Sequence, residues 1–201
     1  MKIGVLALQG AFVEHIAVLR RTGEEATEVK LPEDLYGLDG LIIPGGESTT
    51  ILKLMHGNGL FQPLKKKIEA GFPVMGTCAG MICLAKRVFN SQESFIEPLE
   101  VMDIQVRRNA FGRQVDSFEA DLLIAALGKN PYHAVFIRAP LIEKAGSKVK
   151  VLAKLPSGVI VAAQQERLLV TSFHPELTDD LRFHKYFMKL AAKKPLPVPK
   201  K

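Results

Sequence analysis

The sequence has few cysteines, no long apolar segment and no internal repeat. Its 201 residues include only Cys78 and Cys83, so a disulfide framework has no support, and we expect reduced thiols and a cytoplasmic protein. The N-terminal apolar run at residues 3–8 is too short to span a bilayer and is followed by a turn, so neither a membrane segment nor a secretory signal is expected. Without repeats or low-complexity linkers, residues 1–192 should form one domain.

The positive charge is concentrated at the C-terminus. The formal net charge is +6, but four lysines lie in the proline-rich segment 193–201, and the remainder carries only +2. We predict that this segment is a solvated, disordered tail. The body of the protein then has no electrostatic footprint for DNA or RNA, and a nucleic-acid partner is not expected.

The distribution of apolar residues predicts an α/β fold. In the first half, strand-like segments at 2–8, 26–30, 40–44 and 72–77 alternate with helical patterns that begin at Phe12, run through residues 51–55 and begin again at Phe61. After Ser91, strand-like segments dominate, at 101–108, 114–120, 134–138, 148–154, 159–164 and 168–173. A last helix should begin at Thr178-Asp179-Asp180. We therefore expect a three-layer sandwich whose mostly parallel central sheet is extended by antiparallel strands.

A cysteine lies in a turn of small residues, Gly76-Thr77-Cys78-Ala79-Gly80, directly after an apolar strand. A sharp strand-to-helix turn can present a nucleophile only if its neighbours are very small. Apolar residues at helical spacing from Met81 to Phe89 predict a helix that begins beside Cys78, where its dipole favours the thiolate. The alternative is that Cys78 is a small core residue, as we expect for Cys83.

A paired glycine turn, Gly45-Gly46, follows the strand at 40–44. Such a turn can aim N–H groups into an anion nest or an oxyanion hole, and Ser48 or Thr49 should cap the next helix. The turn lacks the lysine of a phosphate-binding P-loop, which argues against nucleotide binding. In a parallel sheet, this turn and Cys78 fall at the strand ends where ligands bind.

A second candidate site is His174-Pro175-Glu176, at the end of a predicted strand. Proline keeps His174 out of the α region, so Glu176 can reach back to the imidazole and orient it as a base for a distant nucleophile. The alternative is a strand-end histidine with a solvated glutamate. His15, beside an apolar helix stripe, is expected at the surface or its boundary.

Together the cysteine turn and His174-Pro175-Glu176 resemble the class I, or triad, glutamine amidotransferases. More narrowly, the chain resembles the glutaminase subunits of pyridoxal 5′-phosphate synthases from residue 2 to about 187. The motifs that carry this resemblance are Leu8-Gln9-Gly10, Pro44-Gly45-Gly46-Glu47-Ser48-Thr49-Thr50, Arg108-Asn109-Ala110-Phe111-Gly112-Arg113-Gln114, Ser117-Phe118-Glu119, Phe136-Ile137-Arg138 and Ser172-Phe173-His174-Pro175-Glu176-Leu177-Thr178. One departure is Arg107, where an acidic residue is expected; we take Arg108 to face the pocket.

The resemblance implies a flavodoxin-like fold and hydrolysis of L-glutamine to glutamate and ammonia. Cys78, His174 and Glu176 would form the catalytic triad, and the reaction would pass through a γ-glutamyl thioester. The oxyanion would be held by the N–H groups of Gly46 and Ala79. The glutamine site would be formed by Gly46, Glu47, Ser48, Arg108, Ile137 and Arg138. No cofactor and no metal is implied.

A chain of this length has no room for a domain that uses the ammonia, so a partner is expected. In the family this is a (β/α)8-barrel synthase subunit. The nearest alternative is the glutaminase of another ammonia-channelling synthase, such as imidazole glycerol phosphate synthase. A cysteine peptidase or redox-responsive protein on a related fold, or a non-catalytic binding module, are more distant alternatives.

Overall fold

The computed structural model describes residues 1–89, 96–108 and 117–192. Most of the predicted motif at residues 108–114 and the predicted tail at 193–201 lie outside these ranges. The tail and the single domain over residues 1–192 therefore stay predictions.

The described residues form strands, α-helices and short 3-10 helices. The strands are β1 (Lys2–Leu6), β2 (Glu25–Val29), β3 (Gly40–Ile43), β4 (Val74–Thr77), β5 (Ala85–Phe89), β6 (Met102–Arg107), β7 (Ser117–Leu122), β8 (Tyr132–Ile137), β9 (Leu141–Ala145), β10 (Lys150–Lys154), β11 (Ile160–Gln165) and β12 (Leu168–Thr171). The α-helices are α1 (Phe12–Arg21), α2 (Ser48–Gly57), α3 (Phe61–Glu69), α4 (Ala79–Leu84) and α5 (Arg182–Ala192), and short 3-10 helices are η1 (Pro32–Leu35), η2 (Ala125–Leu127) and η3 (Pro175–Leu177).

A mixed sheet forms the centre of the molecule, in the order β2-β1-β3-β4-β12-β11-β9-β6-β5, with β10 paired to β11. Neighbours from β2 to β12 are parallel, whereas β11 is antiparallel to β12, β9 and β10. The predicted mostly parallel sheet with an antiparallel extension is confirmed. The parallel order also brings the ends of β3, β4 and β12 to one edge.

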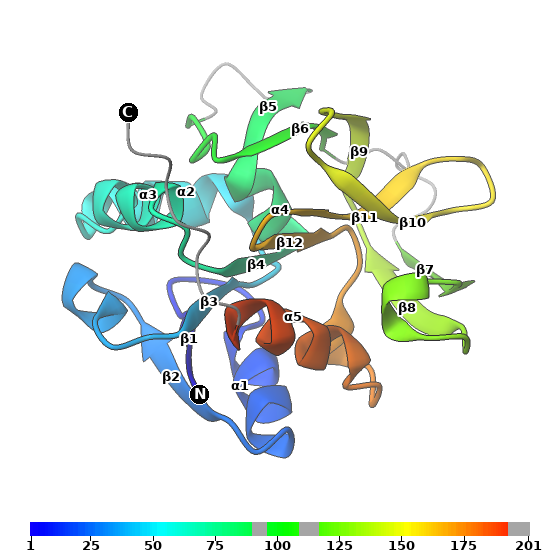
Figure 1. Ribbon diagram of the computed structural model, residues 1–201. Coiled ribbons are helices and arrows are strands. Elements are labelled where there is room, and N and C mark those ends of the chain that lie inside the picture. The colour runs from blue at the N-terminus through cyan, green and yellow to red at the C-terminus, as the bar shows by residue number, and fades with distance from the viewer. Residues whose placement is uncertain (90–95, 109–116, 193–201) are drawn as a thin grey trace.

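The two faces of the sheet bury two separate apolar cores. Along β3, Leu41 and Ile43 belong to the core under α2, α3 and α4, while Ile42 between them belongs to the core under α1 and α5. This alternation follows from the period of two along a strand. Figure 1 shows α2 and α3 on one side of the sheet and α1 and α5 on the other, so the predicted three layers are present.

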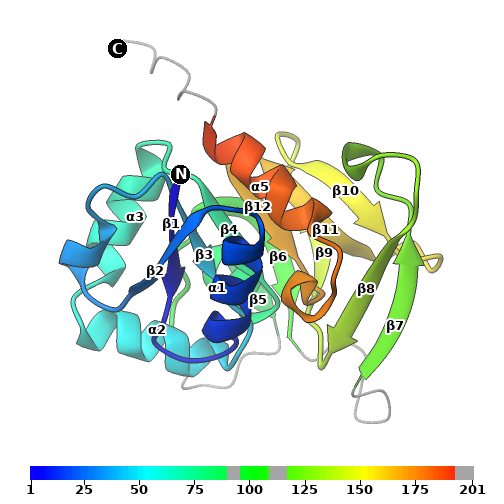
Figure 2. The ribbon, with the colours of Figure 1, turned by 90° about the horizontal axis from the view of Figure 1, so that it is seen from below.

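Two predicted strands do not extend the central sheet. β7 and β8 pair with each other in a separate antiparallel hairpin, with Ser117 opposite Ile137. The hairpin stands at the antiparallel end of the molecule, beside β10 (Figure 2). It packs through Tyr132 and Phe136 against Phe173 and Phe183, and these aromatic rings bury large apolar areas.

The helix predicted from Met81 to Phe89 is wrong in its second half. Helix α4 ends at Leu84, and Ala85 turns to extended backbone at φ −64° and ψ 147°. β5 then pairs in parallel with β6, so pairing with a distant segment overrides an apolar spacing that is compatible with a helix. β9, which pairs with β6 and β11, was not predicted. In the described ranges no helix is long and apolar enough to cross a membrane.

Candidate active site

Adjacent strands bring the cysteine turn and the histidine together. β12 lies beside β4 in parallel register, with Thr171 opposite Thr77. Cys78 therefore leaves β4 at the level where the chain leads from β12 to His174. The amide of Cys78 donates a hydrogen bond of 2.8 Å to the carbonyl oxygen of Thr171, which joins the two strand ends.

Cys78 sits in strained backbone, as the sequence predicts. Its φ is +49° and its ψ is −103°, a conformation that L-residues rarely adopt. The chain after it passes very close to β3, because a Cβ on Gly80 would lie 2.0 Å from the carbonyl oxygen of Ile43. Only glycine fits there, and this tight passage holds the Cys78 side chain at the strand end. Cys78 is 8% exposed.

His174 is oriented by Glu176 and faces Cys78. The Nδ1–H of His174 donates to Glu176 Oε1 at 2.7 Å, and the main-chain N–H of His174 donates to Val135 of β8 at 2.8 Å. Burial works against the charged imidazole, but the hydrogen bonds of the ring with Cys78 and Glu176 outweigh it and raise the pKa of His174 to about 10. The geometry favours an imidazolium beside the sulfur.

Glu176 is buried and yet ionised. Burial works to raise the pKa of its carboxyl, but the hydrogen bond from His174 and the charge of that ring hold the pKa below its usual range. The predicted pairing of His174 with Glu176 is thus present.

The Gly45-Gly46 turn lies against the same site. The amide of Ala11 donates to the Gly45 carbonyl at 3.0 Å, and a Cβ on Gly45 would lie 2.4 Å from His174 Cε1. The main-chain N–H of Glu47 donates to Gln9 Oε1 at 2.7 Å. The segment after β1 therefore braces the turn, which gives Gln9 a role that its place in a motif did not specify.

Glu47 caps helix α2, so the expectation that Ser48 or Thr49 does so is wrong. Its carboxylate accepts from the amides of Thr49 at 3.1 Å and Thr50 at 2.5 Å. A carboxylate reaches two orphan amides at once and is favoured by the helix dipole. Burial works to raise the pKa of Glu47, but hydrogen bonds from the hydroxyl and amide groups of Thr50 and Thr49 outweigh it and lower that pKa.

The two consecutive arginines point to different partners. Arg108 donates to Glu47 Oε1 at 3.3 Å and to Thr49 Oγ1 at 3.4 Å, beside the glycine turn. Arg107 pairs instead with Glu143 of β9, at the partly exposed surface of the sheet. Of the two, Arg108 is the one beside the Gly45-Gly46 turn.

Of the other predicted site residues, Ile137 lies near the sulfur through its main-chain carbonyl, and Ala79 directly follows Cys78 in the chain. The Cys78 Sγ lies 3.9 Å from the carbonyl oxygen of Ile137, and Arg138 follows with φ +42°. Ala79 is the first residue of α4, whose first N–H groups have no partner within the helix. Ser48 is buried, and its hydroxyl has no hydrogen-bond partner within the described ranges.

The burial of His15 was predicted wrongly, and buried His184 was not anticipated. His15 is fully buried, not at the surface or its boundary as predicted, and its ring contacts Thr77, Glu176 and His184. Its apolar neighbours on α1 concealed it, because a histidine inside an apolar stripe has the same pattern as a boundary residue. Cys83 is buried in the core as predicted, and burial raises the pKa of its thiol.

Comparison with known proteins agrees with this geometry. The family model described as the SNO glutamine amidotransferase family matches residues 5–193. The chain belongs to the SNO glutamine amidotransferase family. It is 62% identical to a protein named pyridoxal 5′-phosphate synthase subunit PdxT from Dehalococcoides mccartyi, over 95% of this chain and 97% of that protein.

Other members support this assignment. A PdxT of the same name from Herpetosiphon aurantiacus is 54% identical over 94% of this chain and 100% of its own length. A crystal structure titled glutamine amidotransferase superposes with a TM-score of 0.88 at 49% identity and covers 94% of this chain and 98% of that one. The glutamine amidotransferase activity and the class I fold that the motifs imply are therefore confirmed at the level of the SNO family.

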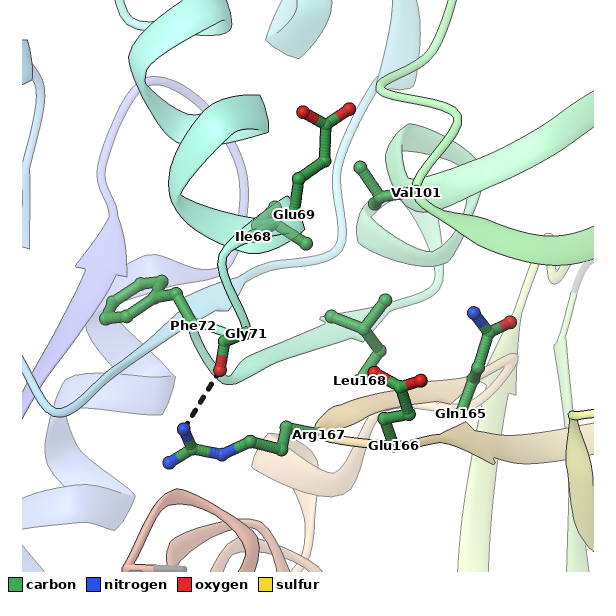
Figure 3. Close-up of a pocket in the computed structure, with 9 residues that line it drawn as sticks. All are labelled: Ile68, Glu69, Gly71, Phe72, Val101, Gln165, Glu166, Arg167 and Leu168. Atoms are coloured by element: carbon green, nitrogen blue, oxygen red, sulfur yellow. Dashed lines mark hydrogen bonds between the residues drawn. The ribbon is translucent and has the colours of Figure 1, made fainter. Parts of the chain in front are cut away.

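A hollow at the opposite edge of the sheet is structural (Figure 3). It lies where β4 and β12 begin, and the Arg167 guanidinium reaches from it to the carbonyl oxygens of Gly71 at 2.9 Å and Ala191 at 2.7 Å. Arg167 thus caps the end of α5 and ties it to the loop before β4. Figure 3 shows the guanidinium turned toward Gly71.

Proposed function

We propose that the chain is the glutaminase subunit of a pyridoxal 5′-phosphate synthase and that Cys78, His174 and Glu176 are its catalytic triad. The observation that carries this proposal is the register of β4 and β12, which brings the sulfur to the imidazole and the imidazole to a buried carboxylate. The assignment to a pyridoxal 5′-phosphate synthase is supported by the names of the relatives, and the triad is supported by the geometry.

The proposed reaction begins with the Cys78 thiolate, stabilised by the His174 imidazolium. The sulfur attacks the side-chain amide carbon of glutamine, and the N–H groups of Gly46 and Ala79 hold the oxyanion. His174 then gives its proton to the departing ammonia. The neutral imidazole next takes a proton from water, which hydrolyses the γ-glutamyl thioester to release glutamate and restore the thiolate.

The substrate would lie between the sulfur and the Glu47–Arg108 pair. Free glutamine carries an α-carboxylate and an α-ammonium group, which need a cation and an acceptor. Arg108 and Glu47 offer these two charges beside the glycine turn. We further assign the walls of this site to Gly46, Ser48, Ile137 and Arg138. No metal and no cofactor has a part in this scheme.

The proposed partner is a (β/α)8-barrel subunit that receives the ammonia, and we place both in the cytoplasm. Because isolated hydrolysis would waste glutamine, we expect weak activity without the partner. Docking would settle the Gly45-Gly46 turn, which is braced here by Ala11 and Gln9, into its oxyanion-binding form.

The test is glutamate release by wild type and by Cys78→Ala, each with and without the barrel subunit. We expect turnover only with Cys78, strongly increased by the subunit. A glutamine-analogue affinity label should modify Cys78 and leave buried Cys83 free. Activity in Cys78→Ala would overturn the nucleophile, and equal turnover with and without the subunit would overturn activation by docking.

A further inference from the structure

Two buried histidines lie behind Glu176, on the side away from His174. His15 Nε2 lies 3.3 Å from Glu176 Oε2 and 3.2 Å from Thr77 Oγ1. On its other side, His15 Nδ1 lies 3.0 Å from His184 Nε2 of α5. His15 and His184 are both 0% exposed. Helices α1 and α5 thus each contribute an imidazole to a polar chain that ends at the proposed triad.

The hydrogen-bond directions in this chain follow from one unpaired nitrogen. Among the residues described, His184 Nδ1 has no hydrogen-bond partner. A buried N–H without an acceptor is rarer and more costly than an acceptor with a spare lone pair, so the proton of His184 belongs on Nε2. That N–H donates to His15 Nδ1. His15 must then carry its own proton on Nε2, the nitrogen that faces Thr77 and Glu176 Oε2.

The charges around His15 support a neutral ring. Burial lowers the pKa of His15, and the nearby imidazolium of His174 acts in the same direction, against the carboxylates of Glu176 and of Glu14 on its own helix. Burial and the proximity of His15 lower the pKa of His184 to about 3, although Glu176 opposes this. Both rings are therefore neutral near pH 7, and each has one N–H to donate.

Building on the proposed triad, we propose that His15, held by His184, is a positioning residue for Glu176. Its Nε2–H faces Oε2 and stabilises the ionised carboxylate, so that Oε1 stays aligned with the Nδ1–H of His174. Glu176 Oε2 is buried and makes no hydrogen bond within the described ranges, and His15 Nε2 approaches it at 3.3 Å. Without the His15 N–H beside it, burial of this oxygen would be offset less, and the carboxyl would take up a proton at higher pH. A protonated Glu176 no longer supports the imidazolium that the thiolate requires.

Two amide substitutions separate this role from packing. The amide nitrogen of glutamine is as many bonds from Cα as His15 Nε2, so His15→Gln keeps a donor toward Glu176. The amide oxygen of asparagine is as many bonds from Cα as His15 Nδ1 and can accept from His184 Nε2–H, so His15→Asn keeps the acceptor toward His184 and loses the donor toward Glu176. Neither amide titrates, and both leave the sulfur and the glutamine site untouched.

The experiment measures kcat and KM for glutamine against pH in the complex with the synthase subunit, with Cys78→Ala as the inactive reference. For His15→Asn we expect kcat to fall roughly 10- to 100-fold with KM within about twofold, and the acid limb of kcat/KM to move to higher pH. His15→Gln should recover most of kcat and the wild-type acid limb. His15→Asn with an unchanged acid limb, or His15→Gln no better than His15→Asn, overturns the proposal.

A second measurement does not depend on turnover. Imidazole 15N chemical shifts of the wild-type protein report which nitrogen carries the proton, and we expect the Nε2–H form for both His15 and His184 at pH 7. A proton on His15 Nδ1 overturns the arrangement even if the variants fail to fold. Activity in Cys78→Ala overturns the triad itself, so the two failures are distinguishable.

Discussion

The main-chain hydrogen bond from Cys78 to Thr171 sets the distance between the proposed nucleophile and its base. It joins the end of β4 to the end of β12 at Thr171. After β12, Phe173 enters the core and His174 begins the turn to η3. The sulfur and the imidazole are thus positioned by the central sheet itself. Rigid elements hold such a pair more accurately than loops do.

The strain at Cys78 predicts an unusual order of stability. At φ +49°, alanine keeps the strain of the native residue and glycine relieves it. We expect Cys78→Gly to be about 0.5–1 kcal/mol more stable than Cys78→Ala in urea unfolding, although glycine is normally the weaker residue. Ala79→Gly, in regular helix one residue later, should be less stable than wild type. A Cys78→Gly variant that is less stable than Cys78→Ala would contradict backbone strain at this position.

Position 45 has room only for glycine, because the imidazole of His174 lies against it. A Cβ there would lie 2.4 Å from Cε1 and 3.0 Å from Nδ1, while the turn itself is tied to Ala11. Gly45→Ala must therefore displace the ring, and we expect kcat for glutamine hydrolysis to fall by about 100-fold or more. Gly57→Ala, where a Cβ meets nothing within 4 Å, is the matched control and should keep full activity. Comparable kcat in both variants would refute the contact.

Substitution of the two adjacent arginines should change KM for glutamine by very different amounts. Arg108 lies beside Glu47 and Thr49, whereas Arg107 is paired with Glu143 at the surface. Arg108→Ala should raise KM for glutamine by roughly 10- to 100-fold through loss of a charged partner for the α-carboxylate. Arg107→Ala should change KM by less than about twofold, because a partly exposed ion pair contributes little. If Arg107→Ala raised KM more than Arg108→Ala, Arg107 and not Arg108 would face the glutamine site.

The raised pKa of His174 predicts that the free energy of unfolding falls as the pH becomes alkaline. The imidazole has a pKa of 6.5 as the unfolded reference and about 10 in the folded protein. Its contribution to the free energy of unfolding is therefore fully present below pH 6.5 and is lost as the pH rises to about 10. Urea unfolding of wild type and His174→Gln should show a difference that shrinks over this window. A constant difference would mean that His174 is neutral in the folded state.

The sequence predicts the parallel half of the fold and the three proposed catalytic residues well, because each has a local signal. The glycine and alanine around Cys78, the proline between His174 and Glu176, and the nearly continuous apolar strands each depend on a few neighbouring residues. The antiparallel half is less predictable, since β5, β9 and the β7–β8 hairpin depend on pairing between distant segments. Strand preference is set largely by such neighbours.

His15 shows the same limit within the site. Nothing near it in the sequence distinguishes a surface histidine from one that reaches a carboxylate 161 positions later. Glu47 was misread for a similar reason: serine and threonine are common helix caps, and only the structure shows a glutamate reaching Thr49 and Thr50.

One short segment touches both halves of the chemistry. Ala11, which precedes α1, holds the carbonyl of Gly45, and His15, one helical turn later, faces the carboxylate of Glu176. The two contacts are about 6 Å apart along the helix axis, so the position of α1 bears on the glycine turn and on the acid together. The start of helix α1 therefore contacts both the glycine turn and the buried carboxylate of the proposed triad.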